Sequence, residues 1–244
     1  FFELNESLKY KIPNITENRK KCSICSWKKF CDREAEINGF LTDIDGIGSK
    51  TAQSLKNIGI HDVKQLASCD ESKLKNKLSI YDENDFKKIN QLINQSKSYL
   101  SGLPIYLKSH KDLLDLFQKL NQGFYVFDIE SNPDENHDFL YGLLSVENMK
   151  EQAKNFVYKP VLNLINKNKH KLEIFNQLNM RRNWPILHFG DTEKITMIKM
   201  AKMFNFNKFE IDYLESRFLD LHLLIRNSWI LPIKNYSLKT VANW

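Results

Sequence analysis

FYVFDIES, residues 124–131, is an apolar run that ends in two carboxylates one residue apart. Its aromatic and branched residues predict a buried strand. Because successive side chains of a strand point to opposite faces, Asp128 and Glu130 share one face, and Phe127 and Ile129 share the other. Two like charges held this close repel each other, and burial adds a desolvation cost. Either the strand end is solvated or a cation lies between the carboxylates.

The sequence after this strand predicts a mixed α/β domain. Two further strands are expected at 139–147 (FLYGLLSVE) and, more briefly, at 155–160 (NFVYKP). A helix at 161–179, a strand at 184–190 (WPILHFG) and a helix at 191–206 follow. The tail, 218–232 and 235–244, reads as helical, with a loop that contains Pro232. Adjacent strands followed by helix, strand and helix indicate a mixed sheet with helices on its faces.

The sequence before the strand predicts a small all-helical region. IDGIGSKTAQSLKNIGIHDVKQLA, residues 44–67, contains two helical patterns around a glycine hairpin. Ala52, Leu55 and Ile58 mark one face of the second helix, and Gly59 has the position of its C′ residue. An amphipathic helix is expected at 84–100, and Ser101-Gly102 after it is a plausible break before a new domain.

The glycine hairpin resembles a helix-hairpin-helix module, with Gly46 and Gly48 framing Ile47. Glycine lets backbone N–H groups turn toward a phosphate at a helix N-terminus, where the helix dipole also favours an anion. Lys50 would add a charge-assisted contact, and no base edge needs to be read, so binding would be independent of sequence. The alternative is a hairpin that only packs helices or binds a neighbouring domain.

Three cysteines stand close together among lysines. Cys22, Cys25 and Cys31 have the spacing C-x2-C-x5-C, which suits zinc or an iron–sulfur cluster. A complete site usually needs four ligands, and Cys69 is the sole other cysteine, within the predicted helical module. We expect the fourth ligand upstream of Phe1. The alternative is three unliganded cysteines in a basic loop.

CSICSWKKFC (residues 22–31), followed by an acidic helix, resembles the C-terminal cysteine triplet of RecB-like nucleases with an iron–sulfur cluster. In that family one cysteine precedes the nuclease core and three follow it. The resemblance covers about the first thirty residues and implies a [4Fe–4S] cluster here. It also implies that most of the RecB-like core lies outside this chain, which therefore reads as an internal fragment of a longer parent.

Residues 124–244 resemble the RNase-H-like exonuclease domain found beside RecB-like modules, which is related to the DEDD 3′–5′ exonucleases. Asp128 and Glu130 match the first motif of that family. The second motif falls on HFGDTEK (188–194), with Glu193 as first choice and Asp191 as the alternative. The final acidic motif would lie beyond Trp244. The resemblance implies two Mg²⁺ or Mn²⁺ ions, which prefer oxygen ligands and, held about 4 Å apart, activate the attacking water.

The acids also have structural interpretations. Asp191 has the position of a helix N-cap, and Glu193 would suit the first turn through the helix dipole. Asp220 is expected to orient a helix or a neighbouring loop rather than to bind metal. His188 is expected to be a packed strand histidine without a role in proton transfer.

The bulk properties agree with a nucleic-acid partner without demanding one. The chain has 244 residues, 42% of them hydrophobic, which suffices for one or two globular domains, and a formal net charge of +6. It shows no secretory signal, no apolar run long enough to cross a bilayer and no disulfide framework. A cytoplasmic location follows as an expectation.

These observations together predict an α/β protein, α+β overall. We expect a remnant of a RecB-like domain at 1–36, a helix-hairpin-helix linker at 37–102 and a truncated RNase-H-like exonuclease domain at 103–244. The expected function is metal-dependent hydrolysis of phosphodiester bonds in DNA repair or processing. The partners would be single-stranded DNA, duplex ends or RNA, and the rest of the parent chain. The alternative is a non-catalytic nucleic-acid-binding module on an RNase-H-like scaffold.

Overall fold

The computed structural model describes residues 25–77, 83–107, 115–116, 118–132, 137–147, 155–160 and 167–244. The chain divides into two compact units. The helical unit comprises the residues up to Ile105 together with Trp229–Trp244, and the sheet unit comprises Tyr106–Ser228. The sheet unit is thus inserted into the sequence of the helical unit. This division differs from the expected domain at 103–244, because the last segment groups with the helices.

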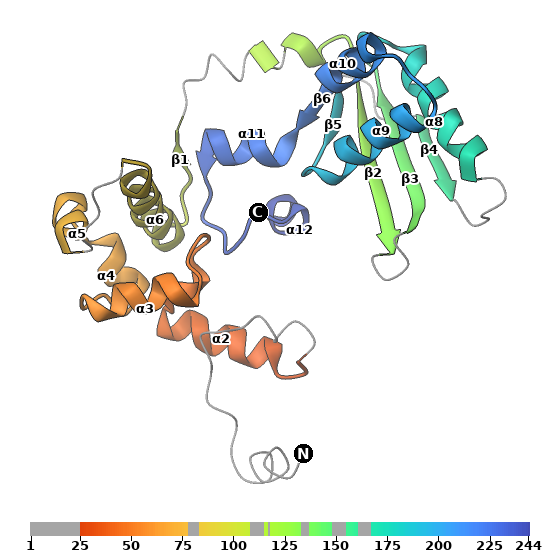
Figure 1. Ribbon diagram of the computed structural model, residues 1–244. Coiled ribbons are helices and arrows are strands. Elements are labelled where there is room, and N and C mark those ends of the chain that lie inside the picture. The colour runs from red at the N-terminus through yellow and green to blue at the C-terminus, as the bar shows by residue number, and fades with distance from the viewer. Residues whose placement is uncertain are drawn as a thin grey trace. The chain divides into compact units, whose positions relative to one another are not determined.

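The helical unit is built mainly of helices, most of them labelled in Figure 1, and residues between Leu41 and Ile93 form its apolar core. The helices are α2 (Lys28–Asn38), the 3₁₀ helix η2 (Leu41–Asp43), α3 (Ser49–Asn57), α4 (Val63–Ala67), α5 (Glu71–Lys77), α6 (Glu83–Ser101) and α12 (Leu238–Asn243). Ala52 and Leu55 on α3 are buried in this core with Ile93 of α6. Gly59 follows α3 with φ of 88°, which confirms its predicted place after the helix.

The C-terminal segment is bound to α6 by buried polar groups. The Gln95 side-chain amide donates a 2.6 Å hydrogen bond to the Leu231 carbonyl and accepts one from the Tyr236 hydroxyl at 3.3 Å. The Tyr236 hydroxyl in turn accepts from the Leu231 N–H at 2.8 Å. Ser98 donates to the Ile230 carbonyl at 3.2 Å. The short strands β1 (Ile105–Tyr106) and β7 (Trp229–Ile230) pair where the chain leaves and re-enters this unit.

The sheet unit contains five strands in the order β4-β3-β2-β5-β6. Its strands are β2 (Phe124–Asn132), β3 (His137–Val146), β4 (Asn155–Pro160), β5 (Ile186–His188) and β6 (Phe218–Asp220). Strand β2 is antiparallel to β3 and parallel to β5, and β5 is parallel to β6. Its helices are α8 (Lys167–Met180), α9 (Thr192–Met203), α10 (Lys208–Arg217) and α11 (Leu221–Ser228). This mixed sheet with flanking helices confirms the predicted fold class.

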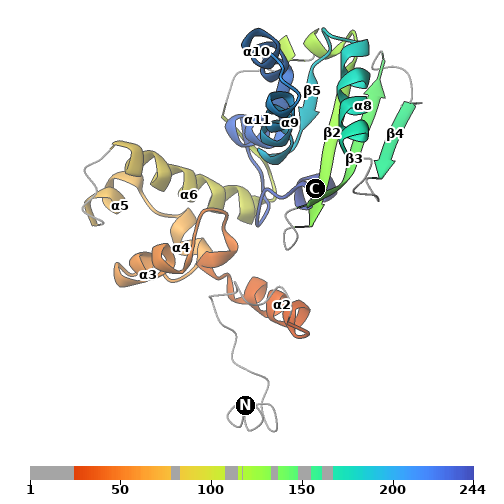
Figure 2. The same ribbon diagram turned by 45° about the vertical axis from the view of Figure 1, so that its right-hand side comes forward.

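The two faces of β2 differ as the alternation of its residues predicts. Tyr125, Phe127 and Ile129 are buried in one core with residues of α8 and α9, whereas Asp128 and Glu130 are exposed on the other face. Both ribbon views show α8 and α9 over the same face of the sheet (Figures 1 and 2). The paired carboxylates therefore project away from the helix-covered core.

Two elements near the end of the sheet unit differ from the prediction. The predicted helix at 218–232 begins only at Leu221, because Phe218–Asp220 pair with β5 as strand β6. Helix α10 was not predicted, although its capping box is readable in the sequence: Asn207 and Glu210 bond to each other's backbone N–H groups. Of the helix predicted at 161–179, residues 161–166 lie outside the described part, and α8 is observed from Lys167.

No helix in the described part of the chain is both long enough and apolar enough to span a bilayer.

Candidate functional site

The two hairpin glycines have different conformational roles. Gly46 has φ of 87°, and a β-carbon built on it would lie 3.2 Å from Cδ2 of Leu92. It is therefore constrained both by its left-handed backbone and by close packing. Gly48 has φ of −88°, which any residue can adopt, and a β-carbon there would meet no atom within 4 Å. Ile47 between them is buried.

This geometry leaves the N-terminus of α3 open. Gly48 is its N-cap and provides no side-chain hydrogen bond to the first turn. The first amides of any α-helix have no acceptor within the helix, and the helix dipole places a partial positive charge there. Ser49 and Lys50 in this turn are exposed. The arrangement can accept an anion that approaches the backbone at Gly48, with Lys50 as a further cation.

The hairpin is also supported from the C-terminal segment. Asp43 of η2, just before the hairpin, is 3% exposed. The Nζ atom of Lys234 lies 3.8 Å from its Oδ2 atom. Because a buried carboxylate needs a counter-charge, this ion pair links the segment after β7 to the start of the hairpin.

The predicted cluster ligands lie only partly within the described residues. Cys22 lies outside them. Cys25 is an exposed free thiol just before α2, and Cys31 is a partly exposed free thiol within α2. Cys69 is partly buried against the helical core and donates to the Gln65 carbonyl. The iron–sulfur or zinc site stays a prediction.

The predicted catalytic acids occupy three different environments. Asp128 and Glu130 are exposed on the open face of β2. Glu193 is only 5% exposed, in the first turn of α9, and that helix packs on the covered face. Asp191 is exposed at the N-cap position of α9, but its side chain makes no capping hydrogen bond.

Glu193 is an incompletely satisfied buried carboxylate. Its Oε2 atom has no hydrogen-bond partner among the described residues and lies 3.9 Å from His188 Nδ1. Burial raises the pKa of Glu193, and the negative charges of Asp128 and Asp220 raise it further. Backbone N–H groups, including that of Ile129 on β2, oppose this shift. Glu193 is therefore within electrostatic reach of Asp128, and a cation beside its free oxygen would relieve the penalty.

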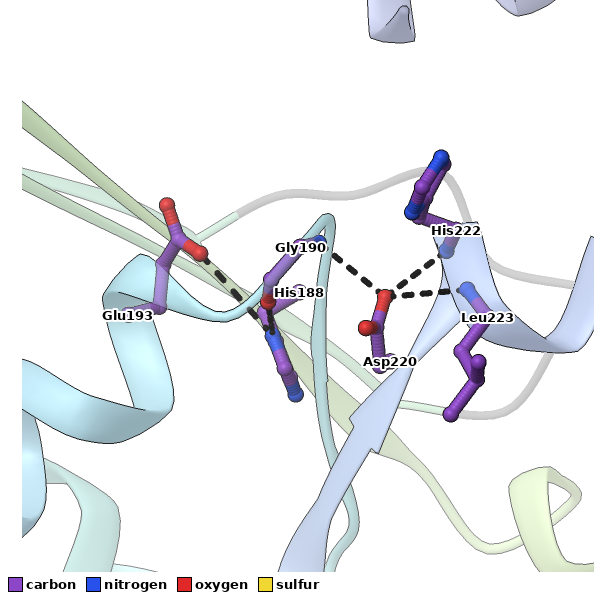
Figure 3. A network of polar contacts seen from close by, with 6 residues as sticks. All are labelled: His188, Gly190, Glu193, Asp220, His222 and Leu223. Carbon is purple, nitrogen blue, oxygen red and sulfur yellow. Dashed lines mark hydrogen bonds and ion pairs between the residues drawn. The ribbon is translucent and has the colours of Figure 1, made fainter. Parts of the chain in front are cut away.

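The turn that leads from β5 to Glu193 is held from two sides (Figure 3). His188 Nδ1 lies 2.6 Å from the Gly190 carbonyl oxygen, so this nitrogen is the donor. Its Nε2 atom then carries no proton, and it is buried without a partner among the described residues. Burial lowers the pKa of His188, which favours the neutral ring. The N–H of Gly190, whose φ is 98°, donates to Asp220 Oδ1 at 3.0 Å.

Asp220 orients this turn and the start of α11. Its Oδ1 atom also accepts from the N–H groups of His222 at 2.8 Å and Leu223 at 3.3 Å. Burial alone would raise the pKa of Asp220, but the N–H bonds from Gly190, Leu223 and His222, with His188, outweigh it and lower the pKa. This confirms the predicted orienting role of Asp220. The contact between His188 and Gly190 was not predicted, although a histidine two residues before a glycine at a strand end is compatible with it.

The described residues supply only part of the predicted metal site. Within the described ranges, no group of three or more His, Cys, Asp or Glu side chains is close enough to hold a metal ion. Asp128 and Asp220 influence Glu193 electrostatically, and Glu130 is not among the causes of its shift. The described donor set therefore does not fit a complete two-metal centre.

The comparisons with known proteins bear on the hairpin alone. Residues 39–79 match the family model described as a SAM-like helix-hairpin-helix tandem. This segment runs from the end of α2 through the hairpin and α3 and α4 to the end of α5. No curated protein and no solved structure is detectably similar to the chain. The chain thus contains a helix-hairpin-helix region, as predicted.

Proposed function

We propose that the chain binds nucleic acid through the hairpin at Gly46–Lys50, by contact with the phosphate backbone and without reading base sequence. The observation that carries this proposal is the open N-terminus of α3, where Gly48 leaves the first-turn amides accessible. Backbone amides at a helix N-terminus favour an anion. A contact limited to phosphates positions the protein but does not specify sequence. DNA, single-stranded or at duplex ends, is the expected partner, with RNA as a further candidate.

Salt-dependent binding of the full chain to labelled DNA tests this proposal. Each phosphate neutralised by a lysine contributes about one unit to the slope of log affinity against log salt. The Lys50→Ala variant should therefore bind more weakly and show a slope smaller by about one. Lys97→Ala is the matched control, because Lys97 is an exposed lysine on α6 outside the hairpin. Equal affinities and slopes for both variants and the parent would refute the role of the hairpin.

We propose metal-dependent hydrolysis of phosphodiester bonds as a second candidate function, with Asp128 and Glu193 as ligands. One observation favours it: a buried glutamate with a free oxygen lies within electrostatic reach of a strand carboxylate. A further ligand would have to come from Glu130 after a local change, or from outside the described residues. We also propose the cysteine cluster and a role in DNA repair, both on the basis of the sequence resemblance.

Metal binding tests the second candidate without relying on activity. In thermal unfolding, Mn²⁺ or Mg²⁺ should stabilise the parent chain and have no effect on Glu193→Gln, since the variant lacks the charged oxygen. Asp128→Asn should reduce the stabilisation by the metal. Asp191→Asn should not, although Asp191 is only two residues before Glu193, because it is exposed at the N-cap position. If the metal shifts the melting temperature of Glu193→Gln as much as that of the parent, Glu193 is not a ligand.

A further inference from the structure

The sheet unit contains a cavity at the end of its strands that is opposite to the predicted carboxylate site of Asp128 and Glu193. Its volume is about 660 Å³, within the range of small-molecule sites. Gln122 precedes β2, Pro185 precedes β5 and Phe218 begins β6, and all three line the cavity. Because these strands are parallel, the cavity is at their amino ends, whereas Glu193 and the Gly190 turn follow the carboxyl end of β5. The cavity is therefore distinct from the carboxylate site.

Arg217 lines this cavity and is a buried cation without an acidic partner. The residue is 7% exposed. Its Nε atom donates to the Trp184 carbonyl at 2.9 Å, and its Nη2 atom donates to the carbonyls of Leu178 and Arg181 at 3.0 and 3.1 Å. These acceptors hold the guanidinium in place at the end of α8, but they are neutral. Among the described residues, no carboxylate forms an ion pair with Arg217 and no acceptor bonds its Nη1 group.

A buried charge is costly unless an opposite charge or sufficient hydrogen bonds compensate it. Burial lowers the pKa of Arg217, which reflects the same cost. An anion in the cavity would compensate it directly. Since Nε and Nη2 already donate to backbone carbonyls, Nη1 is the nitrogen left to donate, and its N–H groups form charge-assisted hydrogen bonds best with phosphate or carboxylate oxygens.

The other lining residues add a second cation, hydrogen-bonding groups and an aromatic ring. Lys119 is an exposed lysine of the wall. Tyr213 contributes an aromatic ring, and its hydroxyl donates to Asn183 Oδ1 at 3.2 Å, while the Ser216 hydroxyl donates to the Tyr213 carbonyl at 2.7 Å. The amide NH2 group of Asn183 is therefore the neutral donor that this part of the wall offers a ligand. One carboxylate, Asp115, lines the cavity. The wall thus combines groups for a phosphate with groups for a planar, hydrogen-bonding ring.

We infer that this cavity binds a nucleoside monophosphate, with the phosphate at Arg217 and Lys119 and the base toward Tyr213 and Asn183. The inference does not depend on the hairpin or on the carboxylate site. A ligand in this cavity would bind at the amino ends of the strands, whereas Glu193 lies in α9 beyond the carboxyl end of β5.

Calorimetric titration of the full chain with 5′-dAMP, deoxyadenosine and inorganic phosphate tests the inference. We expect dAMP to bind, deoxyadenosine to bind at least about tenfold more weakly because it lacks the charge-assisted bonds, and phosphate to compete with dAMP. If phosphate binds as tightly as dAMP, the cavity does not recognise a nucleoside monophosphate and is only an anion site.

Variants locate the binding. Lys119→Ala should weaken dAMP binding roughly fivefold, as expected for a partly exposed charge pair. Lys199→Ala, an exposed lysine of α9 that does not line the cavity, should leave it unchanged. Arg217→Lys should weaken dAMP binding more than Lys119→Ala does, provided that the Arg217→Lys variant folds. If that variant does not fold, the comparison of Lys119→Ala with Lys199→Ala tests whether dAMP binds in the cavity.

Gly48→Ala separates this site from the hairpin. It should weaken DNA binding and leave dAMP binding intact, so each proposal can fail without the other. Absence of dAMP binding at millimolar concentration, equal affinities for Lys119→Ala and Lys199→Ala, or loss of dAMP binding in Gly48→Ala would each overturn the inference.

Discussion

Replacing each hairpin glycine by alanine separates the folding role of Gly46 from the binding role of Gly48. At Gly46 an alanine must adopt a left-handed backbone, which costs about 1–2 kcal/mol. Its methyl group would also lie 3.2 Å from Leu92 Cδ2, so α6 must give way slightly. For a cooperative unit of about 100 residues, this penalty lowers the melting temperature by roughly 4–16 °C.

At Gly48 the same substitution should leave stability nearly unchanged. Its φ of −88° suits alanine, and the new methyl group would meet no protein atom. Alanine reduces the freedom of the unfolded chain, worth about 0.4–1 kcal/mol, but it is a poorer N-cap than glycine by a similar amount. The methyl group does occupy the space in front of the first-turn amides. We expect a roughly tenfold loss of DNA affinity, the cost of one charge-assisted hydrogen bond.

The assay combines thermal unfolding with fluorescence anisotropy of labelled DNA at two salt concentrations. Gly46→Ala should be unstable, and Gly48→Ala should be stable but bind weakly. If Gly48→Ala binds DNA like the parent, phosphates do not approach the N-terminus of α3. If Gly46→Ala unfolds at the temperature of the parent, the left-handed turn and its packing against Leu92 do not constrain this position.

Four further results are expected. Asp220→Asn should lower the free energy of unfolding by about 1–3 kcal/mol, because a neutral amide oxygen would accept from the same three N–H groups without the charge of the carboxylate. Since the pKa of Asp220 is lowered, the advantage of the parent is present above the ordinary aspartate pKa and disappears as the pH falls through the lowered value. In thermal unfolding in metal-free buffer, Glu193→Gln should be more stable than the parent at neutral pH, because the raised pKa of Glu193 shows that its charged form is costly in the folded chain. The difference in stability should vanish below the ordinary glutamate pKa, where the carboxyl group is protonated in both states, and a difference that stays constant with pH would contradict this. Gln95→Leu should destabilise the chain to chemical denaturation by about 1–3 kcal/mol through the unpaired groups of Leu231 and Tyr236, and Gln91→Leu on the exposed side of α6 should not. Protein that also carries the expected fourth ligand should, when purified anaerobically, contain iron and sulfide and lose both in Cys25→Ser; zinc alone, or neither, would exclude the iron–sulfur cluster.

Local patterns predicted the elements whose residues are set by their neighbours in sequence. The alternation in FYVFDIES predicts which side chains of β2 are buried, because a strand repeats every two residues. Gly59 after α3 was predictable because a helix commonly ends in a left-handed residue. Contacts made across the fold were not predictable in this way. Strand β6 has only three residues, too few for a period, and exists because β5 pairs with it.

The candidate site shows the same limit. Its acids could be selected from the sequence, but the burial of Glu193 depends on how α9 packs against the sheet. The hydrogen bond from Gly190 to Asp220 joins residues 30 positions apart, and Arg217 donates to the carbonyl of Trp184, which lies 33 positions before it. A helix missed in the sequence, α10, did carry a readable signal, since Asn207 and Glu210 have the spacing of a capping box.

The return of Trp229–Trp244 to the helical unit has a consequence for synthesis on the ribosome. The chain is made from its N-terminus, so α6 emerges before the residues that satisfy it. Until Leu231 and Tyr236 have been synthesised, Gln95 cannot make its buried hydrogen bonds, and the whole sheet unit is made in the interval. The sheet unit can therefore complete its strands before α6 gains its hydrogen bonds to Leu231 and Tyr236 and before Asp43 gains its ion pair with Lys234. Any fragment that ends near Gly102 would preserve the hairpin sequence and lose part of its support.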